Sequence, residues 1–185
     1  MAIVRDAKAG RRAVELGATL LQLRDPSMSV RTLEREAEHL VTEAPLPVVV
    51  NSRLDVALAA HAAGAHLPEA DLPVAAARRL LGDDLLVGRS VHSVAAASEA
   101  ESQGADYVVF GPVFASDSHP GQTPVGLEAL REVARAVAIP VLAIGGVDAG
   151  RAAECIEAGA AGFAAIGYFA GDAERRDRPR HYSGR

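Results

Sequence analysis

The chain has 185 residues, of which 49% are apolar and 4% aromatic, and its formal net charge is −5. This length suits a single domain, and the acidic balance builds no basic face, so we expect no nucleic-acid partner. The sequence shows no signal peptide and no apolar run of about 18 residues, so we expect a soluble, cytoplasmic protein without a membrane partner.

Short apolar segments alternate with helical ones along the chain. The predicted strands lie at residues 1–6, 20–24, 47–51, 64–68, 85–90, 106–111, 140–146 and 162–167. The predicted helices lie at residues 7–17, 31–43, 54–64, 74–82, 94–104, 126–137 and 149–159, and four of them end at a glycine, namely Gly64, Gly82, Gly104 and Gly159. The strands are rich in Val, Leu and Ala without alternation, which is typical of parallel strands covered on both faces.

The repetition of short βα units predicts an α/β fold, a (β/α)₈ TIM barrel that forms a single domain over residues 1–170. An open doubly wound sheet is the alternative. No G-x-G-x-x-G follows the first strand, which counts against a dinucleotide-binding fold. Because the chain is short for a complete barrel, we expect reduced first and last units. The loop after residues 1–6 is almost absent, and residues 171–185 form a polar tail.

Active sites of such barrels lie at the C-terminal ends of the strands. The polar residues that the predicted strand ends supply are Gln22, Arg24, Asn51, Arg53, His66, Ser90 and His92. The last two strands end in glycines, at Gly145, Gly146 and Gly167. Glycine lets the backbone approach an anion, and a following helix N-terminus favours negative charge, so these turns predict a phosphate site. The alternative is that they are tight strand-to-helix turns.

Each polar strand-end residue also has a purely structural interpretation. Arg24 suits a phosphate or carboxylate, but it also suits a rim pair with Asp25. Asn51 is either a ligand contact or a turn residue. Ser90 is either a ligand contact or the N-cap of the next helix. His92 is either a site residue or a structural hydrogen bonder.

The segment 111–125 is long for a βα connection, and long polar loops in compact domains often cover binding sites. It contains His119, which is either a proton-transfer group or a solvated loop residue. The sequence has no metal motif, and Asp71 with Glu69 gives only a weak indication of a Mg²⁺ site. Cys155 lies in a helical run and is interpreted as a packed residue.

Several of these segments together resemble the thiamine-phosphate synthase and thiazole tautomerase family. They are LLQLRD (20–25), the stretch 48–73, VGRSVHS (87–93), ADYVVFGPVF (105–114) and IPVLAIGGV (139–147). The resemblance implies a (β/α)₈ barrel that binds a thiazole phosphate, held by Gly145, Gly146 and Gly167.

The family contains two activities with different physical demands. The synthase joins a pyrimidine pyrophosphate to a thiazole phosphate with Mg²⁺, whereas the tautomerase moves a proton on a carboxylated thiazole phosphate. The synthase pattern is altered here: Pro26 stands at a usual lysine, Ser52 at a usual aspartate and His119 at another lysine. The stretch 66–71 keeps only the first histidine and the final aspartate of H-x-G-Q-x-D. These losses on the pyrophosphate side favour the tautomerase branch.

The tautomerase places its catalytic histidine directly after the glycine that ends the sixth strand, and that position is Pro112 here. We therefore predict His119 and Ser90 as catalytic residues, with His92 behind them. A thiazole tautomerase-like isomerase of thiamine biosynthesis is our first hypothesis, and it needs no cofactor. The alternatives are a Mg²⁺-dependent synthase, a non-catalytic thiazole-phosphate binder and an unrelated phosphosugar barrel. A phosphorylated small molecule is the expected partner, and a homodimer is the expected assembly.

Overall fold

A computed structural model describes residues 1–115, 121 and 123–169. In that part of the chain eight parallel strands alternate with seven helices. The strands are β1 (Ala2–Val4), β2 (Leu21–Leu23), β3 (Val48–Asn51), β4 (Gly64–Leu67), β5 (Leu86–Val91), β6 (Tyr107–Phe110), β7 (Val141–Ile144) and β8 (Gly162–Ala164). The helices are α1 (Ala7–Glu15), α2 (Val30–Glu43), α3 (Leu54–Ala59), α4 (Val74–Leu81), α5 (Val94–Ser102), α6 (Gly126–Ala136) and α7 (Ala149–Glu157).

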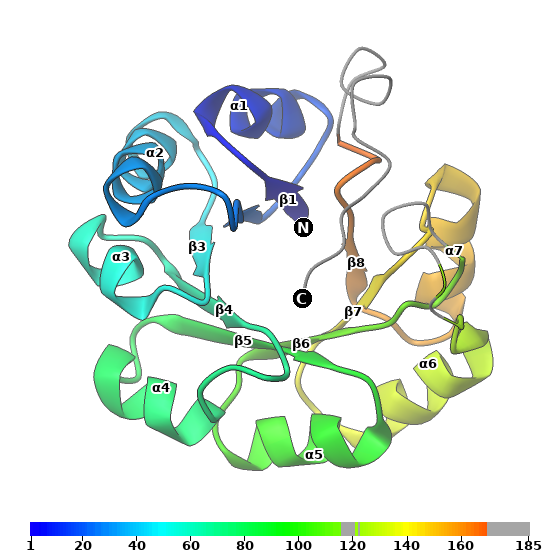
Figure 1. Cartoon of the computed structure of the whole chain (residues 1–185). Coiled ribbons are helices and arrows are strands. Elements are labelled where there is room, and N and C mark those ends of the chain that lie inside the picture. Colours follow the sequence, from blue (N-terminus) through cyan, green and yellow to red (C-terminus); the bar gives the residue numbers. More distant parts are fainter. Residues whose placement is uncertain (116–120, 122, 170–185) are drawn as a thin grey trace.

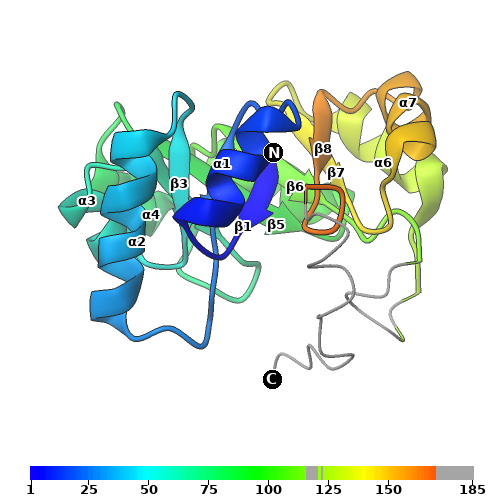
Figure 2. The same ribbon diagram turned by 90° about the horizontal axis from the view of Figure 1, so that it is seen from above.

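The strands pair in sequence order to form a ring, and Figures 1 and 2 show the helices outside it. The ring closes between β1 and the residue after β8, where Ala2 and Ala165 form a parallel bridge. The Ile3 N–H donates to the Ala165 oxygen at 3.0 Å, and the Ala165 N–H donates to the Met1 oxygen at 3.1 Å. The predicted TIM-barrel fold is confirmed.

Alternate residues of each strand feed two separate apolar clusters. One cluster lies between the strands and the helices and holds most of the buried Val, Leu and Ala side chains. The smaller one lies inside the ring, and its members and neighbours are Met1, Ile3, Leu20, Tyr107, Val109, Leu142, Ile144 and Ala164. Because side chains on a strand alternate between faces, the polar residues that share the inward face are brought together above this small cluster.

The first βα unit is reduced as predicted. Only Arg5 and Asp6 separate β1 from α1, and the Asp6 carboxylate caps α1 by accepting the Ala9 N–H at 2.8 Å. A side-chain cap at this point starts the helix without a longer loop, because it satisfies a backbone donor that no carbonyl reaches. The predicted polar tail 171–185 lies outside the described residues.

Helix α3 is shorter than predicted. It ends at Ala59 instead of reaching Gly64, because His61 adopts a left-handed conformation with φ of 52°. The His61 N–H donates to the Leu58 oxygen at 3.2 Å, and the Ala62 N–H donates to the Ala57 oxygen at 2.9 Å. This pair of bonds is the Schellman termination, which usually uses glycine. The glycine rule therefore placed the end of this helix wrongly.

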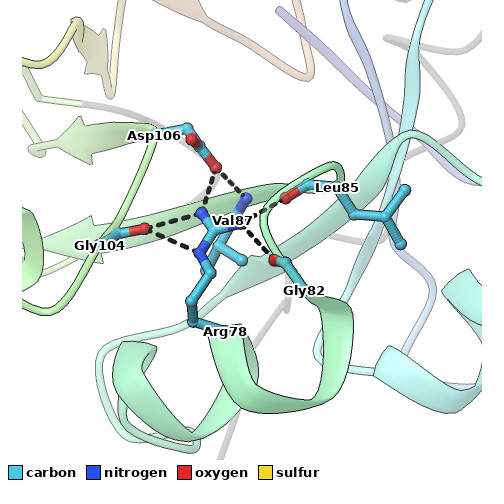
Figure 3. Close-up of polar contacts among 6 residues, drawn as sticks. All are labelled: Arg78, Gly82, Leu85, Val87, Gly104 and Asp106. Carbon is cyan, nitrogen blue, oxygen red and sulfur yellow. Dashed lines mark hydrogen bonds and ion pairs between the residues drawn. The ribbon is translucent and has the colours of Figure 1, made fainter.

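Arg78 of α4 joins two loops at the N-terminal face of the barrel (Figure 3). Its guanidinium donates to the carbonyl oxygens of Gly82, Leu85 and Gly104. It also pairs with the Asp106 carboxylate at 2.6 Å, and the same carboxylate oxygen accepts the Val87 N–H. The segments that lead into β5 and β6 are thus tied to α4 by one side chain.

Candidate active site at the carboxyl ends of the strands

Polar side chains lie on neighbouring strands where β2 to β5 approach the mouth of the barrel. Asn51 of β3 is the register partner of His66 of β4, and His66 hydrogen-bonds Ser90 of β5. Gln22 of β2 is 2% exposed, and its Nε2 lies 3.9 Å from the sulfur of Met1 inside the ring. The structure therefore brings Asn51, His66 and Ser90 side by side and places Gln22 deeper in the barrel.

His66 is almost completely buried at the centre of this site. Its Nε2 lies 2.8 Å from the Ser90 hydroxyl, and its Nδ1 lies 3.3 Å from the Tyr107 hydroxyl. Burial, together with the positive charges of Arg24 and Arg89, lowers the pKa of His66 to about 3. His66 is therefore neutral at physiological pH. Sequence reasoning placed it at a strand end but did not find Tyr107, whose only signal was an aromatic residue in a buried strand.

Arg24 follows β2 and lies close enough to His66 for its charge to act on that imidazole. The acid that follows it in sequence has another partner, since the Arg5 Nε lies 3.0 Å from the Asp25 carboxylate. Burial acts to raise the pKa of Asp25, but hydrogen bonds from Ser27 and Arg5 outweigh it and leave the pKa lowered. The rim pair that the sequence suggested is thus made by Arg5, and the ligand role of Arg24 remains a prediction.

The turn after β3 supports the structural interpretation of Asn51. Ser52 adopts a left-handed conformation with φ of 62°, and its N–H donates to the His66 oxygen at 2.9 Å. The Asn51 Nδ2 donates to the Ser52 hydroxyl at 2.9 Å, and the Arg53 N–H donates to the Asn51 oxygen at 2.7 Å. A non-glycine residue in this region is uncommon and is held there by its surroundings. Asn51 is a turn residue, and its contact with a ligand remains a prediction.

Ser90 and His92 differ in their surroundings. Ser93, not Ser90, caps α5 by accepting the Ala96 N–H, so the capping alternative for Ser90 is wrong. His92 is exposed at the mouth, and its Nδ1 hydrogen-bonds the Gly111 oxygen. Its Nε2 lies 3.8 Å from the Glu69 carboxylate. His92 therefore links the loop after β4 to the end of β6, as its structural interpretation predicts.

The glycines after β7 pack tightly against the chain that follows β6. Gly145 and Gly146 have φ of 95° and 63°, and the Phe114 N–H donates to the Gly145 oxygen at 3.1 Å. A Cβ on Gly146 would lie 2.3 Å from the Ala115 oxygen. Gly167 lies in the turn after β8, the neighbouring strand. Close packing accounts for the first two glycines, and phosphate binding by all three remains a prediction.

Replacing Gly146 by alanine is expected to lower the free energy of unfolding by about 2–3 kcal/mol, because strain at positive φ and a backbone clash add together. Gly17→Ala is the matched control, since Gly17 follows α1 with a positive φ of 81° but has no atom within 4 Å of an added Cβ. We expect it to lose about 1 kcal/mol. Urea denaturation of both variants checks this, and equal losses would show that the contact with Ala115 has no energetic weight.

The loop after β4 carries the predicted metal residue. The Arg89 guanidinium donates to the backbone carbonyl oxygens of Glu69 and Leu72 at 2.6 and 2.8 Å. The Asp71 carboxylate accepts the Leu72 N–H at 2.8 Å. Within residues 1–115, 121 and 123–169, no group of three His, Cys, Asp or Glu side chains is arranged to hold a metal ion. The Glu69 carboxylate of the same loop lies beside His92, and a metal-binding role for Asp71 remains a prediction. The predicted catalytic residue His119 lies outside the described residues.

Two further observations concern the outer surface of the barrel and the character of its helices. A shallow hollow of about 390 Å³ lies on the outside between α2 and α3, and none of the predicted site residues line it. Among the described helices, none has both the length and the apolar character needed to cross a bilayer.

Comparison with known proteins identifies the relatives of this barrel. Residues 4–169 match the family model described as thiamine monophosphate synthase. The chain is 45% identical over 168 residues to the thiamine-phosphate synthase of Methanoculleus marisnigri, covering 89% of this chain and 80% of that protein. It is 43% identical over 158 residues to the thiamine-phosphate synthase of Chloroflexus aurantiacus, covering 83% and 73%.

Solved structures agree with this result. The thiamine phosphate pyrophosphorylase from Pyrococcus furiosus superposes with a TM-score of 0.82 at 34% identity, covering 94% of this chain and 89% of that chain. FabK from Thermotoga maritima superposes with a TM-score of 0.74 at 20% identity, covering 91% of this chain and 58% of that chain, and shows the fold alone.

Proposed function

The chain belongs to the thiamine monophosphate synthase family, and we propose that it is a thiamine-phosphate synthase, which joins a pyrimidine pyrophosphate to a thiazole phosphate and releases pyrophosphate. The observation that carries this proposal is the identity of 41–45% to three proteins named thiamine-phosphate synthase. It favours the synthase over the tautomerase that the altered motifs suggested. Since Pro26, Ser52 and His119 are single substitutions within a similar chain, the similarity of the whole outweighs them.

The geometry of the mouth supports a division of labour between its two sides. Gln22, Asn51 and Ser90 come from neighbouring strands and offer hydrogen-bonding groups suited to a pyrimidine ring. Arg24 supplies positive charge beside them, where a leaving pyrophosphate needs it. On the far side Gly145, Gly146 and Gly167 follow the last two strands, where barrels often hold a phosphate. The thiazole phosphate is assigned to these turns.

Positive charge at the mouth bears on the lysines that the family pattern lacks. The charges of Arg24 and Arg89 both lower the pKa of His66, so both contribute positive potential at the site. Arg89 also donates to two carbonyl oxygens of the loop that carries Asp71. A guanidinium keeps its charge at all physiological pH values, so this pair replaces part of the charge of the missing lysines.

The synthase reaction implies Mg²⁺, and Asp71 fits a limited role in holding it. Mg²⁺ is usually bound by one or two carboxylates together with substrate phosphates and water, not by a cage of protein ligands. Asp71 would hold the ion with the pyrophosphate oxygens, and the ion would supply positive charge to the leaving group. This fits a chain with Ser52 at the second carboxylate position, and it predicts that the metal binds with the substrate.

The proposal is tested by incubating the purified protein with both substrates, with and without Mg²⁺, and measuring pyrophosphate release and thiamine phosphate. We expect both products, and only with Mg²⁺. A parallel reaction with the carboxylated thiazole phosphate alone tests the tautomerase. Isomerisation without pyrophosphate release would overturn the proposal and restore the first hypothesis, and tight binding with neither reaction would leave a non-catalytic binder.

Replacing Arg24 by methionine is expected to lower kcat/KM for the pyrimidine pyrophosphate at least about tenfold, because a charge-assisted contact to the leaving group is lost. Arg31→Met is the matched control, since Arg31 is an exposed residue of α2, and its kcat/KM should stay unchanged. Steady-state kinetics of pyrophosphate release check both variants. Equal activity of Arg24→Met and wild type would remove Arg24 from the site.

A further inference from the structure

Three side chains from consecutive strands form one hydrogen-bonded line across the inside of the barrel. Tyr107 of β6 contacts the Nδ1 of His66, and the Nε2 of His66 contacts the Ser90 hydroxyl, at 3.3 and 2.8 Å. Tyr107 and His66 are 5% and 3% exposed, and their rings stack with centroids 5.7 Å apart. The line therefore runs from the closed interior to the half-buried Ser90 near the mouth.

The backbone makes room for this arrangement at Gly88 of β5. A Cβ on Gly88 would lie 2.1 Å from Cζ of Tyr107 and 2.4 Å from its hydroxyl oxygen. Any other residue there would displace the phenol ring from His66, because buried rings in a packed interior cannot move freely. The strand thus leaves a space that Tyr107 fills, and the phenol is held against the imidazole.

The protonation states of the two buried groups decide which atoms carry hydrogen. His66 is neutral, since burial and two nearby arginines lower its pKa to about 3. Burial raises the pKa of Tyr107, so the phenol keeps its hydrogen. A neutral imidazole has one N–H and one acceptor nitrogen. The hydrogen bonds can therefore run from Tyr107 towards Ser90, with the imidazole hydrogen on Nε2, or from Ser90 towards Tyr107, with that hydrogen on Nδ1.

Counting donors selects between the two directions. Among the residues that the structure describes, His66 is the hydrogen-bond partner found for the Tyr107 hydroxyl. If Nδ1 carried the imidazole hydrogen, the phenol hydrogen would be buried without an acceptor, which costs roughly 1–3 kcal/mol. The phenol therefore donates to Nδ1, and Nε2 carries the hydrogen and donates to the Ser90 oxygen. The Ser90 hydroxyl hydrogen then points to another acceptor.

We propose that Tyr107 and His66 are positioning residues that fix Ser90 as a hydrogen-bond donor to an acceptor atom of the pyrimidine substrate. The assignment of the ligand rests on the proposed function, whereas the direction of the line rests on the structure alone. With the other tautomer of His66, Ser90 would donate its hydrogen to Nε2. Its oxygen would then be available to the ligand only as an acceptor. The line thus selects which ligand atom Ser90 can bind.

The tautomer is measured directly by nitrogen NMR of protein labelled with ¹⁵N-histidine, in which the two ring nitrogens of a neutral imidazole differ in chemical shift. We expect Nε2 of His66 to carry the hydrogen in the free protein and with the pyrimidine pyrophosphate bound. Hydrogen on Nδ1 would overturn the proposal. This measurement needs no turnover, so it decides the direction of the line even if the chain releases no pyrophosphate.

A double-mutant cycle tests the link to the ligand. Tyr107→Phe keeps the ring and removes only the hydroxyl, so we expect kcat/KM to fall about three- to tenfold with little change in the unfolding transition. In a Ser90→Ala background the same change should have no further effect, because the residue that it positions is gone. An equal fall in both backgrounds would show a structural role and overturn the proposal. If the enzyme proves inactive, the same cycle is measured on the Kd of the pyrimidine pyrophosphate.

Discussion

Replacing Arg78 by methionine is expected to lower the free energy of unfolding by about 2–4 kcal/mol, although Arg78 lies at the face of the barrel opposite the predicted site. Its guanidinium satisfies three carbonyl oxygens and one carboxylate, and its side chain is only 16% exposed. Removing it leaves Asp106 without its cation and the oxygens of Gly82, Leu85 and Gly104 without their donor. Leaving a buried acceptor without its charged donor costs more free energy than the hydrogen bond contributed to folding.

The matched control for this variant is the next residue of the same helix. Arg79 is exposed, and its guanidinium donates to the Ala75 oxygen within α4. Methionine has nearly the helix propensity of arginine, so Arg79→Met should change stability by no more than about 0.5 kcal/mol. Chemical denaturation of both proteins gives the comparison. Similar small losses in the two variants would mean that water replaces the guanidinium of Arg78 without cost.

The free energy of unfolding is expected to fall by about 2–3 kcal/mol between pH 7.5 and pH 4.5, because of His66. Its pKa is about 3 in the folded protein, against 6.5 for an ordinary histidine. As the pH falls through 6.5, the unfolded chain takes up a proton that the folded chain does not. The contribution is thus fully present above pH 6.5 and is lost at up to about 1.4 kcal/mol per pH unit below it.

The pH window separates this effect from the carboxylates. The pKa values of Asp25 and Asp55 are lowered from 3.8, so their contributions are lost mainly below that pH. Denaturation curves at several pH values between 4.5 and 6 measure the slope in wild type and in His66→Gln, which should lack it. Above pH 6 the buried Met1 amine, whose pKa is lowered from 8.0 to about 6, adds a slope of its own. His39→Gln, at an exposed position of α2, should keep it. If His66→Gln does not fold, nitrogen NMR of wild type still decides, since protonation of His66 above pH 4.5 would contradict the prediction.

Much of the fold was predictable because its signals are local. Short Val- and Leu-rich runs and the glycines that follow helices gave strand and helix positions close to those observed, and Gly82, Gly104 and Gly159 do adopt positive φ after their helices. The failure at α3 has a physical reason. His61 takes the left-handed conformation that the rule reserves for glycine, and nothing in the residue type indicates this.

The site was predictable only as far as topology alone determines it. The carboxyl ends of parallel strands meet at one face, so Asn51, His66 and Ser90 were expected near one another. Which side chains touch depends on the register between strands and on the room left by Gly88, and neither follows from spacing along the chain. The line from Tyr107 through His66 to Ser90 was therefore not predicted. The choice between two activities also lay beyond the motifs, because it needed the similarity of the whole chain.

The strand junctions around the barrel are not equally strong, because the ring closes through few hydrogen bonds. Seven of its junctions are continuous ladders, whereas β1 meets the last strand through one bridge, between Ala2 and Ala165, and a hydrogen bond from the Met1 amine to the Phe163 oxygen at 2.7 Å. The resistance of the ring to opening is then set by its weakest strand junction, the one between β1 and β8. Thermal breathing starts where the fewest bonds must break together. We therefore expect local opening of the barrel to begin at this junction, beside the turn that holds Gly167, away from the paired strands β4 and β5.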